Sequence, residues 1–343
     1  MPTSCLLWLL TLLLGLPVSG CAAQPFTATP ITLHDQSGHP GDAYGGIRLL
    51  GALRLADATL NGVRLCGLSG LAWDEGADLL YAVSDRGALF HLRPEFNAQG
   101  YLSGMQALAA YPLRDASGAV LRAGFGDAEG LTLRPDPRMP STTELLISFE
   151  GKPRVARYSP KGVWRGEETL PTVLSTARNY RHSNQGLEAI ALTPRWGTVL
   201  GTEVPLRADP KDQLRLFAMD GRFWQYPLGK APGSALVAME ALADGSLLLL
   251  ERAFVNPLRP LIISLRRTEA LSTPGMQRLQ VTDVVTFDST QGWLLDNFEG
   301  LTHYRDQRFF IFFIVSDDNC KTWQNTLLLY FELKASSAGS PAP

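Results

Sequence analysis

The stretch Asp296-Asn297-Phe298-Glu299-Gly300-Leu301, followed by an apolar run to Ser316-Asp317-Asp318, decides the fold because a similar pair of steps occurs five times along the chain. Each copy opens an apolar strand with a Glu-Gly-Leu-like step, and a second apolar strand then ends on a carboxylate. The copies begin at residues 69, 129, 188, 240 and 299, so they lie 60, 59, 52 and 59 residues apart. Such regular self-similarity indicates a repeat architecture.

Every copy is defined by its opening step and its closing acid. The five read Ser69-Gly70-Leu71 to Ser84-Asp85-Arg86, Glu129-Gly130-Leu131 to Ser148-Phe149-Glu150, Glu188-Ala189-Ile190 to Thr202-Glu203, Glu240-Ala241-Leu242 to Glu251-Arg252, and Glu299-Gly300-Leu301 to Ser316-Asp317-Asp318.

Four short apolar runs, rich in β-branched and aromatic residues, occur in each of the first four repeats, which is the strand count of a propeller blade. In the second repeat, for example, strands are predicted over 131–133, 144–149, 154–158 and 168–174. Helical periodicity is nearly absent. The sequence therefore predicts an all-β chain built from four-stranded blades.

The last repeat shows only three strands, and the segment Ile47 to Leu55, which precedes the first repeat, would supply the fourth. Ring closure of this kind removes exposed sheet edges. We therefore expect a β-propeller of five four-stranded blades closed by an N-terminal strand. Extra strands near Pro30 to Leu33 and Gly62 to Cys66 would instead allow a sixth blade.

The first 20 residues are typical of an export signal, with an apolar run from Cys5 to Leu16 that is too short to span a bilayer. Val18-Ser19-Gly20-Cys21 resembles a bacterial lipobox, so we expect lipidation at Cys21; the alternative is plain cleavage of a secretory signal. Ala22 and Ala23 do not favour retention at an inner membrane. The expected location is the periplasm, as a lipoprotein anchored in the outer membrane.

The remaining boundaries follow from composition. Residues 21–44 are expected to form a partly extended tether, residues 45–334 the propeller domain, and residues 335–343, rich in Ser, Ala, Gly and Pro, a disordered tail. The net charge is −2 and no basic run occurs, so we expect no nucleic-acid partner. The membrane would be contacted only through the lipid on Cys21, and we expect a monomer.

Two cysteines, Cys66 and Cys320, lie near the two ends of the folded part of the chain. In an exported protein they are candidates for a disulfide that joins the first repeat to the last. Two unrelated buried thiols are the alternative.

The two strands of each repeat run antiparallel, so the opening step and the closing acid share one edge of a blade. Around a ring, all the acids then face the mouth of the central channel, as candidate catalytic groups or metal ligands. We expect Glu129, Glu188 and Glu299 to be catalytic or metal-ligating, and Asp85, Asp127, Glu150, Glu203, Glu251 and Asp317 to hold metal.

Such a cluster requires neutralisation, and oxygen-rich sites with Asn184, Asn297 and Asn319 alongside suit Ca²⁺. No His/Cys cluster with zinc-like spacing occurs. Four arginines flank the acids and would bind an anionic substrate: Arg86, Arg154, Arg181 and Arg252. Any single acid could instead lock a blade through backbone hydrogen bonds. His182 could be a general acid, although a solvated loop histidine is the commoner case.

The ordered motifs resemble the phytase-like domain family, labelled "esterase-like activity of phytase". The resemblance rests on Gly67-Leu68-Ser69-Gly70-Leu71, Leu80-Tyr81-Ala82-Val83-Ser84-Asp85-Arg86-Gly87, Asp127-Ala128-Glu129-Gly130-Leu131, Asn184-Gln185-Gly186-Leu187-Glu188, Leu248-Leu249-Leu250-Glu251-Arg252, Asp296-Asn297-Phe298-Glu299-Gly300-Leu301 and Val315-Ser316-Asp317-Asp318-Asn319. It runs from about Ile47 to Leu333 and implies an exported bacterial β-propeller with ester-hydrolysing activity.

Three functions are compatible with these features. The first is a Ca²⁺-dependent hydrolase of phosphate esters that acts on a small anionic ligand. The second is a non-catalytic lipoprotein whose propeller face binds a ligand or a protein. The third is hydrolysis of a lactone or a carboxyl ester at the same metal.

Overall fold

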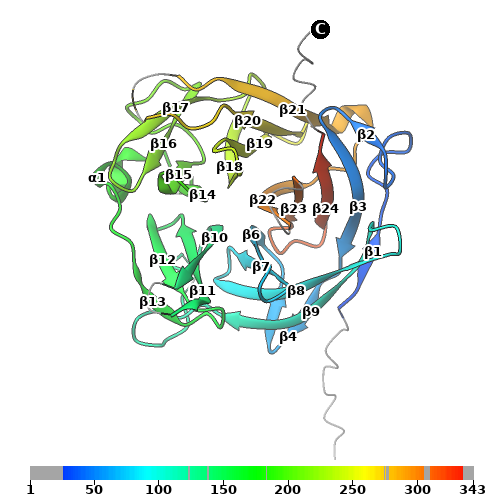
Figure 1. The fold of residues 1–343 in the computed structure, drawn as a ribbon, viewed down its shortest axis with the longest axis horizontal. Coiled ribbons are helices and arrows are strands. Elements are labelled where there is room, and N and C mark those ends of the chain that lie inside the picture. The colour runs from blue at the N-terminus through cyan, green and yellow to red at the C-terminus, as the bar shows by residue number, and fades with distance from the viewer. Residues whose placement is uncertain are drawn as a thin grey trace, which may run out of the picture.

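Five four-stranded blades surround a central channel in the computed structural model of the chain (Figure 1). The structure describes residues 26–122, 124–136, 139–182, 184–273, 275, 278–304 and 310–334. The predicted signal segment, Cys21 and the predicted tail from residue 335 lie outside this part of the chain. Within it, no helix is long and apolar enough to cross a membrane.

Each blade is an antiparallel sheet whose first strand lines the channel. The strands are β6 to β9 (Leu68–Asp74, Leu79–Ser84, Ala88–Phe96, Leu102–Pro112), β10 to β13 (Ala128–Asp136, Met139–Phe149, Arg154–Tyr158, Trp164–Glu167), β14 to β17 (Leu187–Thr193, Gly197–Thr202, Gln213–Ala218, Phe223–Pro227), β18 to β21 (Ser234–Ala241, Leu247–Ala253, Ile262–Thr268, Val281–Asp288), and β22 to β24 (Asn297–His303, Ile311–Asp317, Thr326–Leu333) with β3 (Ile47–Leu55).

The fifth blade closes the ring with β3, which pairs along the whole of β24, as the sequence predicts. β1 (Ala28–Pro30) and β2 (Ala43–Tyr44) also pair with β3, so part of the expected tether belongs to this sheet. β4 (Ala58–Leu60) and β5 (Val63–Leu65) form only a two-stranded hairpin. The alternative of a sixth blade was therefore wrong: these extra strands pair with an existing blade or with each other.

One predicted strand was also wrong. The fourth strand of the second blade is β13, which ends at Glu167, and the predicted segment 168–174 instead runs into a short helix, α1 (Thr172–Ser175). The apolar residues that suggested a strand have another use, since Leu174 is buried against Leu146 and Val155 of the second blade.

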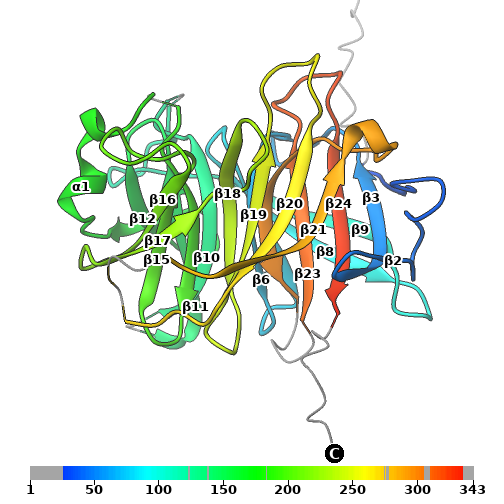
Figure 2. The same cartoon turned by 90° about the horizontal axis from the view of Figure 1, so that it is seen from above.

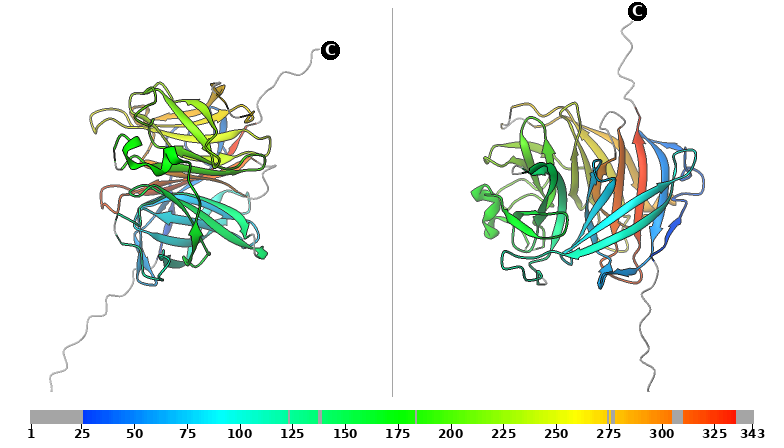
Figure 3. Two further views of the ribbon diagram at one scale, coloured as in Figure 1. Left: turned by 90° about the vertical axis from the view of Figure 1, so that its left-hand side faces the viewer. Right: turned by 60° about the horizontal axis from the view of Figure 1, so that its bottom comes forward.

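Apolar side chains fill the interfaces between neighbouring blades. In the described residues they form five clusters, one for each interface around the ring. Between the first two blades, for instance, Val83 packs with Ile147 and Phe149, all fully buried. Burial of this kind is the main stabilising term, at about 25 cal/mol per Å² of apolar surface. The blades therefore form one ring-shaped body, seen from further sides in Figure 3.

A β-bulge interrupts the first strand of every blade near its beginning. One extra residue opposes the partner strand at Ser69, in the Glu129-Gly130 step, and at Glu188, Val237 and Glu299. A bulge redirects the side chain at the extra position. The glycine beside the acid has a packing reason: a Cβ on Gly130 would lie 2.3 Å from the carbonyl oxygen of Glu188 in the next blade.

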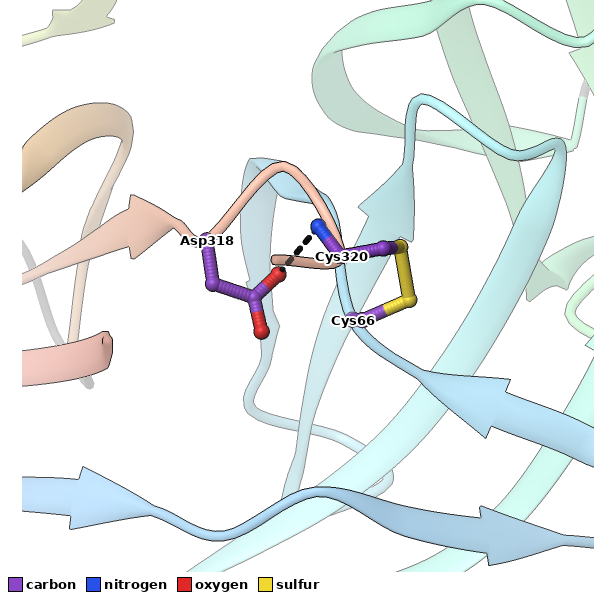
Figure 4. Close-up of side chains that lie close together, drawn as sticks. All are labelled: Cys66, Asp318 and Cys320. Atoms are coloured by element: carbon purple, nitrogen blue, oxygen red, sulfur yellow. Dashed lines mark hydrogen bonds between the residues drawn. A yellow bond between two sulfur atoms is a disulfide. The ribbon is translucent and has the colours of Figure 1, made fainter. Parts of the chain in front are cut away.

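The disulfide between Cys66 and Cys320 joins the segment before the first blade to the loop after β23 (Figure 4). The Asp318 carboxylate reinforces this junction, because its Oδ1 accepts from the backbone N–H of Gly67 at 2.8 Å and of Cys320 at 2.9 Å. The predicted pairing is therefore present, and it links two segments that are 254 residues apart.

Candidate metal and substrate site

The first strand of each blade begins, and the second strand ends, at one end of the ring, which we call the mouth. A cavity of about 560 Å³ opens there, and carboxylates dominate its walls. Its acidic lining residues are Asp85, Asp127, Glu129, Glu150, Glu188, Glu203, Glu299 and Asp317. The predicted convergence of acids from different blades on one face is thus present.

Local backbone geometry places these acids. Glu129, Glu188 and Glu299 lie at or beside the bulges of β10, β14 and β22. The closing acids of four blades occupy a matching position, one residue after the partner of the residue that precedes the bulge: Asp85, Glu150, Glu203 and Asp317. The opening acids lie on the first strand of a blade and the closing acids follow the second strand. Because these two strands are antiparallel, both kinds of acid lie at the same edge of the blade.

Among the residues that the structure describes, two groups of three carboxylates are close enough to hold cations. One is Asp127, Glu129 and Glu150, and the other is Glu150, Glu188 and Glu203; within each, the ligand oxygens lie within 4.8 Å of one another. Glu150 belongs to both groups. An all-oxygen donor set of this kind suits a hard cation such as Ca²⁺, so the residues present fit a metal site.

The fourth blade departs from the other four. At the position of their closing acids it carries Arg252: Glu251 pairs with Leu236 directly before the bulge, as Phe149 pairs with Ala128 in the second blade, and Arg252 follows Glu251. The half-buried Arg252 guanidinium donates to Glu203 Oε1 at 2.8 Å, to Glu299 Oε1 at 2.5 Å, and to Asn297. This arginine therefore neutralises part of the acidic cluster.

Burial and mutual repulsion raise the carboxyl pKa values. Burial, opposed by a backbone hydrogen bond from Gly186, raises the pKa of Glu150 to about 7. Burial also raises the pKa of Glu299 to about 7 despite Arg252, and that of Asp317 to about 8 with help from Glu299. The pKa values of Glu129 and Glu188 lie well above the usual range, mainly because both are buried and secondly because neighbouring carboxylates repel their charge.

The remaining acids follow the same pattern. Burial raises the pKa of Asp85 to about 6, and it raises the pKa values of Asp127 and Glu203 as well. Without a cation, the cluster therefore holds protons near neutral pH. A bound cation would displace them.

One predicted position at the mouth, that of Glu251, was wrong, and Glu240, the opening residue of the fourth repeat, also lies away from the mouth. Glu251 points away from the cavity and is buried between strands, where it accepts from Tyr226 and from Arg266 Nη1 at 2.8 Å. Glu240 lies near the other end of β18, where Oε1 is 3.2 Å from His303 Nδ1. The bulge in β18 is at Val237, three residues earlier, so the fourth blade contributes an apolar side chain instead of an opening acid.

Three of the four predicted substrate-binding arginines lie outside the cavity lining. Arg154 donates to the Phe125 carbonyl and stacks on Phe149, and Arg181 donates to the carbonyls of Pro205 and Asp209. Arg86 is largely exposed beside Asp85, with Nε 3.4 Å from Oδ1. His182 is exposed and does not line this cavity.

Sequence reasoning missed several neutral lining residues. Gln185, Val204, Ser234 and Phe254 complete the cavity beside Asn184, Asn297 and Asn319. Gln185 adjoins the Glu188 motif and could have been found by proximity. No feature of the sequence predicts Phe254 in the cavity, because its position depends on the conformation of the loop after β19.

The family described as Phytase-like, "Esterase-like activity of phytase", matches residues 63–320. The chain belongs to this family. Curated proteins include no match to the sequence. Among solved structures, the PQQ-bound form of aldose sugar dehydrogenase from Streptomyces coelicolor is similar at a TM-score of 0.42 and 12% identity, over 85% of this chain and 99% of that chain.

Proposed function

We propose that this phytase-like propeller is a Ca²⁺-dependent hydrolase of phosphate esters. One observation carries the proposal: the Glu150 carboxylate belongs to two carboxylate groups, one with Asp127 and Glu129 and one with Glu188 and Glu203. This arrangement suits two neighbouring cations that share a ligand, a pattern used to bind and activate phosphate esters.

The charge of the cavity supports a cation-mediated mode of substrate binding. Eight acids line it, and among the described lining residues Arg252 is the one basic group, already paired with Glu203 and Glu299. A phosphate ester would be repelled by this surface unless cations neutralised it. The substrate phosphate would therefore be bound through metal rather than through arginine.

Different residues of the cavity would bind the cations and accept the proton. When bound, Ca²⁺ would polarise a phosphoryl oxygen and lower the pKa of a coordinated water. Asp127, Glu129, Glu150, Glu188 and Glu203 would hold the cations. Glu299, fixed by Arg252 Nη1 and by Asn297 Nδ2 at 2.8 Å, is oriented towards the same cavity and would accept a proton from the attacking water.

The test is turnover of p-nitrophenyl phosphate and bis-p-nitrophenyl phosphate by purified protein, with Ca²⁺ and with a chelator. We expect Ca²⁺-dependent release that Glu188→Gln abolishes. Glu240→Gln is the matched control, because this acid lies at the far end of β18. No turnover of any phosphate ester at saturating Ca²⁺ would overturn the proposal.

The same experiment, extended to a lactone, a carboxyl ester and a thermal melt, separates the other two functions. A non-catalytic binding propeller would show a higher melting temperature with Ca²⁺ and no turnover. Hydrolysis of lactones or carboxyl esters alone, lost in Glu188→Gln, would assign the site to that chemistry instead.

We also propose export and lipid anchoring through Cys21, which lies outside the described residues. The lipobox-like Val18-Ser19-Gly20-Cys21 supports this. Replacement of Cys21 by Ser should move the protein from the membrane fraction to the soluble periplasmic fraction. An unchanged distribution would argue against the anchor.

A further inference from the structure

Large apolar side chains are exposed mainly at the mouth. In the described part of the chain eight are exposed, and six of these lie on segments at the mouth end: Val120, Phe125, Phe254, Val255, Leu258 and Trp323. Leu258 is 95% exposed and Trp323 is 76% exposed. Exposed apolar side chains that are concentrated on one face mark an interaction surface.

Two of these segments project from the ring. The loops that follow β19 and β23 extend beyond the strand ends on one side of the molecule (Figure 2). Leu258 is held at the tip of its loop by a turn, because Asn256 Oδ1 accepts from its backbone N–H at 2.9 Å and the Asn256 carbonyl accepts from Arg259 at 3.0 Å. The apolar side chain is therefore presented outward by local hydrogen bonds.

Basic side chains accompany the apolar ones. Arg259 follows Leu258, and the Lys321 ammonium lies 5.8 Å from the centroid of the Trp323 ring. Arg122 and Lys152 are also exposed on mouth-end segments. None of these four has an ion pair among the described residues. Aromatic and apolar groups next to free Lys and Arg are typical of segments that enter the interface of an anionic bilayer.

The beginning of the described chain lies at the same end. Ala28 pairs with Leu55, which pairs with Thr326 directly after the loop that carries Trp323. Residue 26 is therefore at the mouth, and five further residues lead to Cys21, a reach of at most about 18 Å. A lipid on Cys21 would hold the mouth end close to the membrane surface.

We propose that the loops around Phe254 to Arg259 and Lys321 to Trp323, with Phe125, form a docking surface for a lipid bilayer that contains anionic headgroups. Leu258 and Trp323 enter the interfacial region, and Arg259 and Lys321 contact headgroup phosphates. This surface would add a direct contact with the bilayer beside the lipid on Cys21. The proposal does not depend on catalysis, and it places the acidic cavity against the membrane.

The test is cosedimentation with vesicles, using the full chain with Cys21→Ser so that no acyl chain contributes. Vesicles of phosphatidylcholine alone are compared with vesicles containing phosphatidylglycerol. We expect binding to the anionic vesicles, with at least a tenfold loss of apparent affinity for Leu258→Asp and for Trp323→Asp. Both side chains are largely exposed, so a thermal melt should confirm that the variants remain folded.

Val163→Asp is the matched control, because Val163 is 48% exposed on the β12–β13 turn at the end away from the mouth. It should bind vesicles like the parent. Absence of vesicle binding by the parent, or equal binding by the Leu258→Asp and Trp323→Asp variants, would overturn the proposal. Self-association that Leu258→Asp abolishes, without vesicle binding, would overturn it too and assign the surface to a second copy of the chain.

Discussion

Arg252 donates to Glu203 Oε1 at 2.8 Å and thereby links the fourth blade to the third across the mouth of the channel. It occupies the position at which the other four blades place an acid. Its second ion pair, with Glu299, reaches the fifth blade. One cation therefore bridges three blades within a cluster of carboxylates, and several consequences can be tested.

Removal of this bridge should lower the free energy of unfolding of the metal-free protein. Arg252→Gln leaves Glu203 and Glu299 buried without their cation, which costs about 3–5 kcal/mol when one partner of a buried pair is lost. Urea unfolding in the presence of chelator measures this. Ca²⁺ should recover part of the loss by supplying positive charge.

A matched control is Arg222→Gln, which removes an exposed pair with Asp220. It should leave the unfolding midpoint unchanged. If Arg252→Gln unfolds at the same urea concentration as the parent in chelator, the bridge has no stabilising role.

Glu150 is the shared member of both carboxylate groups, so its loss should affect both. We expect Glu150→Gln to lower Ca²⁺ affinity by more than about 100-fold, beyond the effect of removing an outer-shell partner. Isothermal titration calorimetry gives the affinity and the number of ions bound. A variant with the parent's affinity would show that cations bind elsewhere.

The stability of the metal-free protein should fall as pH rises. The pKa rises from 4.5 in the unfolded chain to about 7 in the fold at Glu150 and Glu299, and from 3.8 to about 8 at Asp317. The folded state therefore binds more protons, and the stabilisation present below pH 4.5 is lost as pH rises towards 8, by at least about 2 kcal/mol.

Thermal melts in chelator between pH 5 and pH 8 measure this trend. Ca²⁺ should reverse it, because deprotonated carboxylates bind the cation more tightly. In Asp317→Asn the melting temperature measured in chelator should fall less steeply with pH than in the parent. A metal-free protein that is more stable at pH 8 than at pH 5 would contradict the assignment.

The disulfide should contribute to closure of the ring. Cys66→Ala with Cys320→Ala opens a link that spans 254 residues, and loss of such a link typically costs about 2–5 kcal/mol. Urea unfolding with and without reductant measures the change. The double variant should be insensitive to reductant, and a parent that is equally insensitive would show that the link is not formed in solution.

The sequence by itself determined the five-fold rhythm, the four-stranded blades and closure by the segment 47–55. Short apolar runs separated by turn residues carry that information locally. It also indicated most of the mouth acids, because antiparallel neighbours bring the start of one strand to the end of the next. Asp85, Glu129, Glu150, Glu188, Glu203, Glu299 and Asp317 were all found in this way.

Only the tertiary structure decided the register. A bulge adds one residue to a strand, so every later side chain changes face. The bulge of β18 lies at Val237, three residues before Glu240, so Glu240 lies away from the mouth. The residue type of Val237 does not indicate a bulge. Glu251 pairs with Leu236 one position before the closing position, so it faces Tyr226 and Arg266, and Arg252 stands in the cluster instead. A repeat in the sequence indicates which residues recur, whereas strand pairing decides which of two neighbouring side chains faces the channel.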